Sequence, residues 1–109
     1  MAPRSKLCLI VRADLSPGLQ ASQAVHAAQA FQATHPALCA AWMADSNTLA
    51  ILAVPDVAAL QRTLERAQDA GVPHAAFRDD DLTVPLTAIA LAPAAATRRI
   101  CRDLDLALS

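Results

Sequence analysis

The segment DLSPGLQASQAVHAA, residues 14–28, decides the fold of this chain together with the apolar run LCLIV that precedes it at residues 7–11. An apolar run of this length without alternation is typical of a strand that is covered on both faces. Ser16 is suited to cap a helix, and Pro17 suits the first helical position, where no amide hydrogen is needed. We therefore predict a buried strand, a tight turn and a helix over residues 17–34.

The predicted first helix carries two different faces. One face is apolar at helical spacing and is expected to pack against a sheet: Ala21, Ala24, Val25, Ala28 and Phe31. The other face gathers side chains that are neighbours because they lie three or four positions apart: Leu19, Ser22, Gln23 and His26. Its polar groups interrupt an otherwise apolar helix, which makes this face a candidate functional surface.

The remainder of the chain alternates predicted helices and strands. Three further helices are expected. The first covers residues 36–45, the second begins after a cap at Asp56 and ends before Gly71, and the third covers residues 93–103. Strands are expected over residues 49–54, 72–77 and 86–92, with a polar loop at residues 78–83. In the helix after Asp56, the residues expected to face the core are Val57, Leu60, Leu64 and Ala67. This alternation predicts an α/β layered fold, and 109 residues suffice for a single domain.

Composition narrows the class of protein. The formal net charge of −1 predicts no broad nucleic-acid-binding surface, so any phosphate-binding surface must be local. The three cysteines, Cys8, Cys39 and Cys101, lack metal-ligand spacing and favour a reducing compartment. No apolar run is long enough to span a membrane. We therefore expect a cytoplasmic protein without a membrane partner.

Polar residues cluster where two predicted strands end. Arg12 and Asp14 follow the first strand, and Arg78 and Asp79 follow the third. Ligands of α/β sheets bind beyond the carboxyl ends of parallel strands, where helix N-termini also point. If the first and third strands are parallel, these side chains converge with those of the first helix.

Four segments in this order resemble the second type of peptidyl-tRNA hydrolase: residues 6–15, 21–28, 77–79 and 86–93. This family is typical of archaea and eukaryotes and has compact bacterial relatives. The resemblance extends from Lys6 to about Leu106. It implies one three-layer domain, with a four-stranded mixed sheet and helices on both faces, in a homodimer. It also implies hydrolysis of the ester between a peptide and the 3′ end of tRNA, without a metal or another cofactor.

The resemblance also implies roles for particular residues. Gln23 and His26 match a family pattern of lysine, glutamine and histidine, in which Leu19 occupies the lysine position. Asp79 and Thr83 match an arginine-aspartate pair followed by a threonine, which begins at Arg78. The implied catalytic residues are Asp79, Gln23, Thr83 and His26, with Asp79 orienting or deprotonating a water molecule. The implied contacts to phosphate or the terminal ribose involve Arg12, Asp14, Ser22 and Arg78.

Two departures from the family pattern support an alternative function. Leu19 cannot donate a side-chain hydrogen bond, and Asp80 and Asp81 add negative charge beside Asp79. A non-catalytic binding protein that retains the fold is therefore the second hypothesis. A third is a metal-dependent phosphoesterase that uses Asp14 with Asp79 to Asp81, because hard cations prefer clustered carboxylates. Adjacent carboxylates in one turn rarely converge on one ion, which counts against this hypothesis.

Each candidate residue also has a structural interpretation. His26 can bond a backbone carbonyl, and Gln23 can make a packing bond to a loop. The aspartates from Asp79 to Asp81 can form a solvated turn, and Asp14 can stabilise the N-terminus of the first helix. Catalysis by cysteine is disfavoured, since Cys8 lies within the buried first strand.

Overall fold

The computed structural model describes residues 5–83 and 85–108. Its helices are α1 (Pro17–Thr34), α2 (Pro36–Asp45), α3 (Val57–Asp69) and α4 (Ala95–Cys101). Its strands are β1 (Lys6–Arg12), β2 (Thr48–Val54), β3 (His74–Arg78), β4 (Leu86–Leu91) and β5 (Asp105–Leu106). The predicted elements are all present, with ends that shift by a few residues, and β5 is additional.

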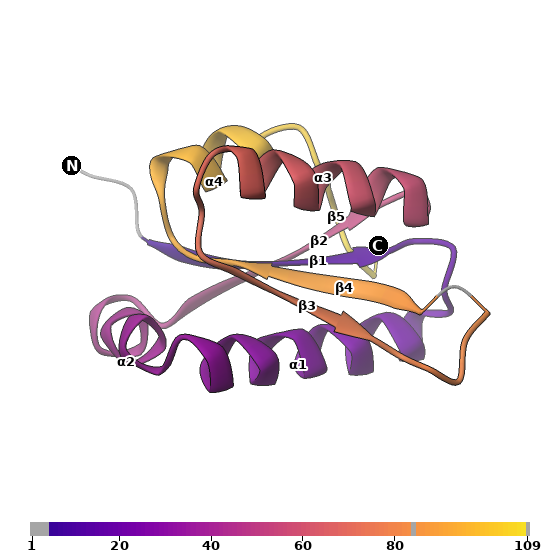
Figure 1. The fold of residues 1–109 in the computed structure, drawn as a ribbon, viewed down its shortest axis with the longest axis horizontal. Helices are drawn as coiled ribbons and strands as arrows, with labels where there is room; N and C mark the ends of the chain where they lie inside the picture. Colours follow the sequence, from indigo (N-terminus) through magenta and orange to yellow (C-terminus); the bar gives the residue numbers. More distant parts are fainter. Residues whose placement is uncertain (1–4, 84, 109) are drawn as a thin grey trace.

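The five strands form one mixed sheet in the order β3-β4-β1-β2-β5 (Figure 1). β1 is parallel to β2 and antiparallel to β4, and β4 is antiparallel to β3. Two antiparallel steps give β3 the same direction as β1. The carboxyl ends of β1, β2 and β3 therefore share one edge of the sheet, which is the condition under which the polar clusters were expected to converge.

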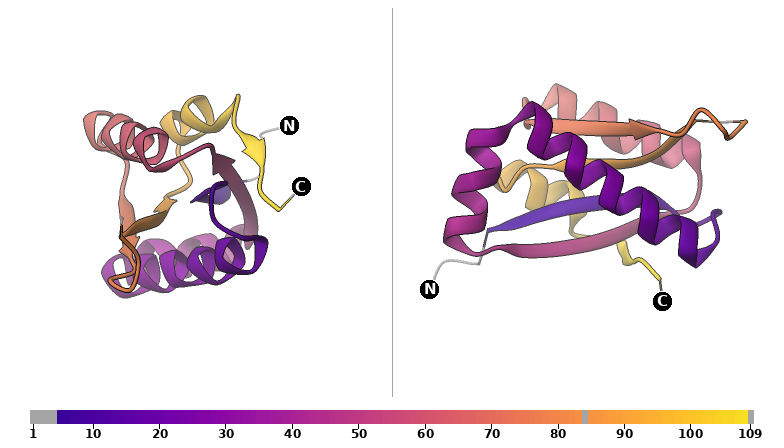
Figure 2. Two further views of the ribbon diagram at one scale, coloured as in Figure 1. Left: turned by 90° about the vertical axis from the view of Figure 1, so that its right-hand side faces the viewer. Right: turned by 90° about the horizontal axis from the view of Figure 1, so that it is seen from below.

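The sheet lies between two layers of helices. α1 and α2 cover one face, and α3 and α4 cover the other (Figures 1 and 2). This arrangement confirms the predicted compact α/β domain with three layers. The fifth strand differs from the expectation of four: Leu106 pairs with Leu52, and Asp105 pairs with Ala53. A two-residue strand has no periodicity in the sequence, so only its position beside β2 reveals it.

Both predicted N-caps are confirmed. Ser16 Oγ accepts a hydrogen bond from the Leu19 amide at 3.3 Å. Asp56 Oδ1 accepts one from the Ala59 amide at 2.9 Å. These bonds satisfy backbone donors that the first turn of a helix leaves free. Gly71, just past the end of α3, has the positive φ of 71° expected of a glycine at this position.

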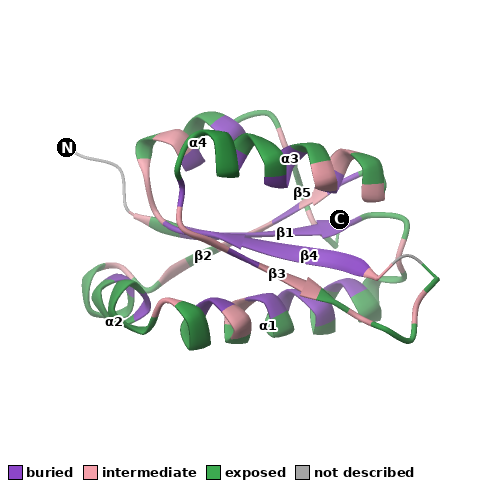
Figure 3. Cartoon of the chain, viewed as in Figure 1, coloured by how far each residue is buried: buried purple, intermediate pink, exposed green. Residues whose placement is uncertain are grey.

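The two central strands form the core. In β4 every residue is buried, and in β1 every residue after Lys6 is buried (Figure 3). α3 packs through Leu60, Thr63, Leu64 and Ala67, close to the predicted face. Among the described residues, no helix is both long and apolar enough to cross a membrane.

The predicted packing face of α1 is partly wrong. The residues of α1 that are buried are Gln20, Gln23, Ala24, Ala27 and Phe31. Ala21 is exposed, and 58% of the Val25 surface is exposed. Alanine covers so much of this helix that its apolar residues do not define one rotation about the helix axis. The observed rotation turns Gln20 and Gln23 inward, where both form hydrogen bonds.

Candidate active site

A chain of side-chain hydrogen bonds joins α1, β4 and the loop after β3. Thr87 Oγ1, in β4, donates to Gln23 Oε1 at 2.7 Å. Gln23 Nε2 then donates to Asp79 Oδ2 at 3.1 Å. Thr87 is fully buried and Gln23 is 3% exposed. Because the Gln23 oxygen is occupied by the threonine hydroxyl, its NH₂ group is the part that faces Asp79.

Asp79 is held by its own turn as well as by Gln23. Its Oδ1 accepts a hydrogen bond from the Asp81 amide at 3.0 Å, and its amide donates to the Pro85 carbonyl at 2.8 Å. Asp79 is half-buried, whereas Asp80 and Asp81 are exposed. A carboxylate can accept more than the two hydrogen bonds that Asp79 receives from the described side chains and amides. The carboxylate is therefore fixed in position and can still accept a proton from a water molecule.

Thr87 was not among the predicted site residues, although the sequence contains a signal for it. It is a hydroxyl residue within the apolar run LTAIALA. A buried hydroxyl needs a hydrogen-bond partner, so a threonine in a strand covered on both faces implies a buried polar contact. The partner, Gln23, lies in α1 and is brought close only by the packing of α1 on β4.

His26 lies next to this chain of bonds. Its ring stacks on Phe77, with ring centroids 4.5 Å apart and planes 16° from parallel. Its Nδ1 lies 3.2 Å from Gln29 Oε1. The hydrogen-bond partner of this nitrogen is therefore a side chain and not the backbone carbonyl that the structural interpretation expected. Since Phe77 directly precedes Arg78 and Asp79, His26 contacts the strand end that carries the acidic residue.

Three other predicted residues lie on the surface near this chain of bonds. Arg78 and Thr83 are exposed residues of the segment that contains Asp79. Ser22 is exposed beside Gln23 in α1, and its hydroxyl donates to the Leu19 carbonyl at 3.2 Å. These side chains are accessible to a ligand.

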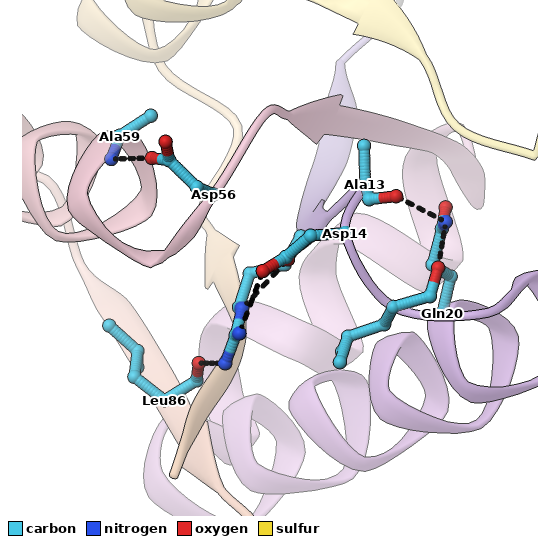
Figure 4. A network of polar contacts seen from close by, with 8 residues as sticks. Ala13, Asp14, Gln20, Asp56, Ala59 and Leu86 are labelled. Atoms are coloured by element: carbon cyan, nitrogen blue, oxygen red, sulfur yellow. Dashed lines mark hydrogen bonds and ion pairs between the residues drawn. The ribbon is translucent and has the colours of Figure 1, made fainter. Parts of the chain in front are cut away.

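Arg12 and Asp14 form an ion pair at the end of β1 (Figure 4). Arg12 Nε and Nη2 donate to the two Asp14 oxygens at 3.0 and 2.9 Å. Arg12 Nη1 also donates to the Leu86 carbonyl at 3.1 Å, and only 8% of Arg12 is exposed. The pair thus ties the turn after β1 to the start of β4, which also carries Thr87.

The Arg12 guanidinium lowers the pKa of Asp14 below its ordinary value, chiefly through its hydrogen bonds and secondarily through its charge. A carboxylate whose pKa is lower in the folded protein than in the unfolded chain stabilises the fold. This stabilisation is complete at pH values above the pKa of the unfolded chain, and it is lost as the pH falls through the pKa of the folded protein. We expect the free energy of unfolding, measured by urea denaturation, to fall in the wild type as the pH is lowered below about 4. The fall should be smaller in Asp14→Asn, which lacks this carboxylate. The effect should be modest, because 43% of the Asp14 side chain is exposed. Equal acid sensitivity of the two proteins would contradict this prediction.

Gln20 is a second inward polar residue that was not predicted. Its Nε2 donates to the Leu15 carbonyl at 2.7 Å and lies 3.5 Å from the Ala13 carbonyl (Figure 4). It also lines a cavity of about 420 Å³ with Pro17, Val54 and other residues, but Asp79 does not line this cavity. We place the candidate site at Asp79 rather than at this cavity, because the predicted catalytic side chains Gln23 and Asp79 meet there.

No group of three or more potential metal-ligating side chains occurs in the described part of the chain. Asp14, which the metal hypothesis needs beside Asp79 to Asp81, pairs with Arg12 instead. The site has the parts of a water-activating centre: a carboxylate acceptor, an amide donor and a buried hydroxyl that fixes the amide.

Comparison with known proteins places the chain in a family. The family model described as peptidyl-tRNA hydrolase PTH2 matches residues 5–106. No curated protein is similar enough to count as a match. A solved structure from Agrobacterium tumefaciens strain C58, titled a protein of unknown function, is similar in fold, with a TM-score of 0.71 and 14% identity. The similarity covers 96% of this chain and 98% of that one. Since the family model spans nearly all of the sequence, the chain belongs to the peptidyl-tRNA hydrolase PTH2 family.

Proposed function

We propose that this protein hydrolyses the ester bond of peptidyl-tRNA, or of a related N-acyl-aminoacyl nucleotide ester, through a water molecule held by Asp79. The observation that carries the proposal is the Thr87–Gln23–Asp79 chain of hydrogen bonds in a member of this family. It joins the predicted catalytic residues Gln23 and Asp79, which are far apart in the sequence. The buried Thr87 holds the Gln23 side chain in position.

In the proposed reaction, Asp79 accepts a proton from water as the water oxygen attacks the ester carbonyl carbon. The carbonyl oxygen becomes negatively charged, and the C–O bond to the ribose then breaks. The 3′ oxygen of the ribose takes up the proton from Asp79, which regenerates the base, and the peptide carboxylic acid loses its own proton to solvent. The products are a peptide carboxylate and a free tRNA end. A positioned general base of this kind supplies a rate factor of about 10² to 10⁴.

The remaining rate enhancement must come from donors to the developing oxyanion. Gln23 uses one of its two amide hydrogens on Asp79, so the second is available to the water or the oxyanion. The exposed Thr83 hydroxyl, from the same loop, is the other proposed donor. Loss of one such donor typically costs a factor of about 10² to 10³.

Substrate recognition is assigned to the exposed surface around the loop. Arg78, at the end of β3, is proposed to contact a phosphate, with Ser22 contacting phosphate or ribose from α1. Arg12 and Asp14 support this surface by holding the start of β4. His26 is proposed as a positioning residue that acts on the Arg78–Asp79 segment through its stack on Phe77.

The direct test is release of N-blocked amino acid from N-blocked aminoacyl-tRNA. We expect turnover above the uncatalysed rate that is unaffected by a chelator, whereas the metal hypothesis requires a chelator to abolish it. Absence of turnover at high protein concentration would contradict the proposal and favour the second function, a binding protein that retains the fold. Leu19, Asp80 and Asp81 are the observations behind that second function.

Leu19→Lys separates the two functions further. Leu19 is 38% exposed and lies one helical turn before Gln23, so a lysine there can reach the surface beside Asp79. A charged donor is worth about 1.5–3 kcal/mol, and we therefore expect kcat/KM to rise by about 10- to 100-fold. Leu19→Met is the matched neutral control and should leave kcat/KM unchanged. An equal gain in both variants would show that charge is not the cause.

The proposal includes a homodimer in the cytoplasm, where translation takes place. An exposed apolar surface supports association: Val25, Leu38, Met43 and Leu49 are each at least 44% exposed. Val25, Met43 and Leu49 also line a groove of about 240 Å³ between α1, α2 and the sheet. Sedimentation equilibrium measures the association directly, and a monomer throughout the micromolar range would contradict it.

A further inference from the structure

Two of the three thiols meet on the side of the sheet opposite α1. Cys8 lies in β1, and Cys101 is the last residue of α4. Both are free, and each influences the acidity of the other. They line one cavity of about 320 Å³, in which Cys8 is 5% exposed and Cys101 is half-buried. Residues that are distant in the sequence thus form a dithiol beside an open space.

The cavity around the dithiol is basic. Lys6, Arg98 and Arg102 line it together with the two sulfurs, and none of the described residues that line it is acidic. Reactive cysteines are found in electropositive, partly accessible surroundings of this kind. Cys39 is as buried as Cys8, but it differs in its surroundings, because it lines an apolar groove with Trp42, Met43 and other residues.

The two thiols differ in acidity. The interaction with the Cys101 side chain lowers the pKa of Cys8, and the charge of Lys6 lowers it further, against the opposing effect of burial. The pKa of Cys101 is raised by its interaction with the Cys8 side chain and by burial, although the charge of Arg66 acts in the opposite direction. Cys8 is thus the more acidic thiol of the pair. In the protonated state, the Cys8 thiol has the Lys6 carbonyl as a weak acceptor at 4.0 Å.

We propose that Cys8 and Cys101 form a redox-active dithiol that hydroperoxides convert into an intramolecular disulfide. The site is separate from the Asp79 site, because Cys8 faces α4 whereas Gln23 belongs to the helix that packs on the opposite face of the sheet. The proposal therefore does not depend on the hydrolase activity.

The reaction needs one hydroperoxide for each pair of thiols. The Cys8 thiolate attacks one peroxide oxygen and the O–O bond breaks, which leaves a sulfenic acid on Cys8 and an alcohol, or water when the oxidant is hydrogen peroxide. Cys101 then loses its proton and attacks the Cys8 sulfur, so that the S–S bond forms and the sulfenic oxygen leaves as water. Two electrons pass from the two sulfurs to the peroxide.

The test treats the whole reduced chain with an equimolar amount of hydrogen peroxide, then denatures it and alkylates it with N-ethylmaleimide. Before alkylation, we expect the intact mass to be lower by the mass of two hydrogen atoms. After alkylation, we expect one modified cysteine, Cys39. Proteolytic peptides should contain Cys8 joined to Cys101. In Cys101→Ser, dimedone should trap a sulfenic acid on Cys8, because the second thiol is missing.

Cys39→Ser is the matched control and should form the same disulfide as the wild type. Three alkylated cysteines after peroxide treatment would overturn the proposal, as would a disulfide that includes Cys39 or joins two chains. The wild-type mass and peptide measurements decide the question even if Cys101→Ser does not fold. A Lys6→Gln variant should oxidise several-fold more slowly, since the charge of Lys6 favours the Cys8 thiolate.

Discussion

Asp79→Asn is expected to lower kcat/KM for N-blocked aminoacyl-tRNA by about 10²- to 10⁴-fold, which is the contribution of a general base. An amide has one acceptor oxygen where the carboxylate has two. The amide side chain of this variant therefore cannot accept from both Gln23 Nε2 and the Asp81 amide while keeping the observed geometry. The variant loses the proton acceptor and also part of the hydrogen bonding that positions this segment. Single-turnover kinetics would measure the chemical step directly.

Two neighbouring carboxylates provide the controls for this variant. Asp80→Asn and Asp81→Asn remove the same charge from the same loop, but both side chains are exposed. Exposed charges have small, salt-dependent effects. We expect these variants to retain kcat/KM within a few-fold or to increase it, because the loop then repels a polyanion less. Full activity of Asp79→Asn would remove Asp79 from the mechanism.

Phe31→Ala is expected to lower the free energy of unfolding by about 3–5 kcal/mol, the usual cost of removing a buried phenylalanine ring. Phe31 is fully buried on the inner face of α1, and its ring lies 5.0 Å from that of His35. The lost ring leaves a cavity that the surrounding side chains can fill only in part. Urea denaturation with a common m-value would measure the change.

The matched control for Phe31→Ala is Val25→Ala in the same helix, measured at a concentration low enough to keep the chain monomeric, because Val25 also belongs to the proposed dimer surface. Because 58% of Val25 is exposed, its truncation should change the free energy of unfolding by no more than about 0.5 kcal/mol in a monomer. The pair compares a buried and an exposed apolar side chain on one helix. Similar losses in the two variants would show that α1 is not rotated as described.

Much of the candidate site could be predicted from the sequence, since Gln23 and Asp79 were both expected there. The sequence left open whether β1 and β3 run in the same direction; the sheet gives them that direction, with β4 between them. Thr87 was missed because its role depends on a contact between α1 and β4, segments that are far apart in the chain. The pairing of Arg12 with Asp14 rather than with an exposed ligand likewise depends on the position of the Leu86 carbonyl.

The sequence by itself determined the local features of this protein. The Ser16 and Asp56 caps and Gly71 specify helix ends through interactions within a few residues, and the apolar pattern of β1 marks it as a buried strand. The tertiary structure alone decided the rotation of α1. An alanine-rich helix offers similar apolar surface on several sides, and Phe31 belongs both to the predicted face and to the buried one, so the apolar pattern in the sequence does not specify the rotation. Long-range hydrogen bonds of Gln23 to Thr87 and Asp79 distinguish the possible rotations, and they turn Gln23 toward the candidate site.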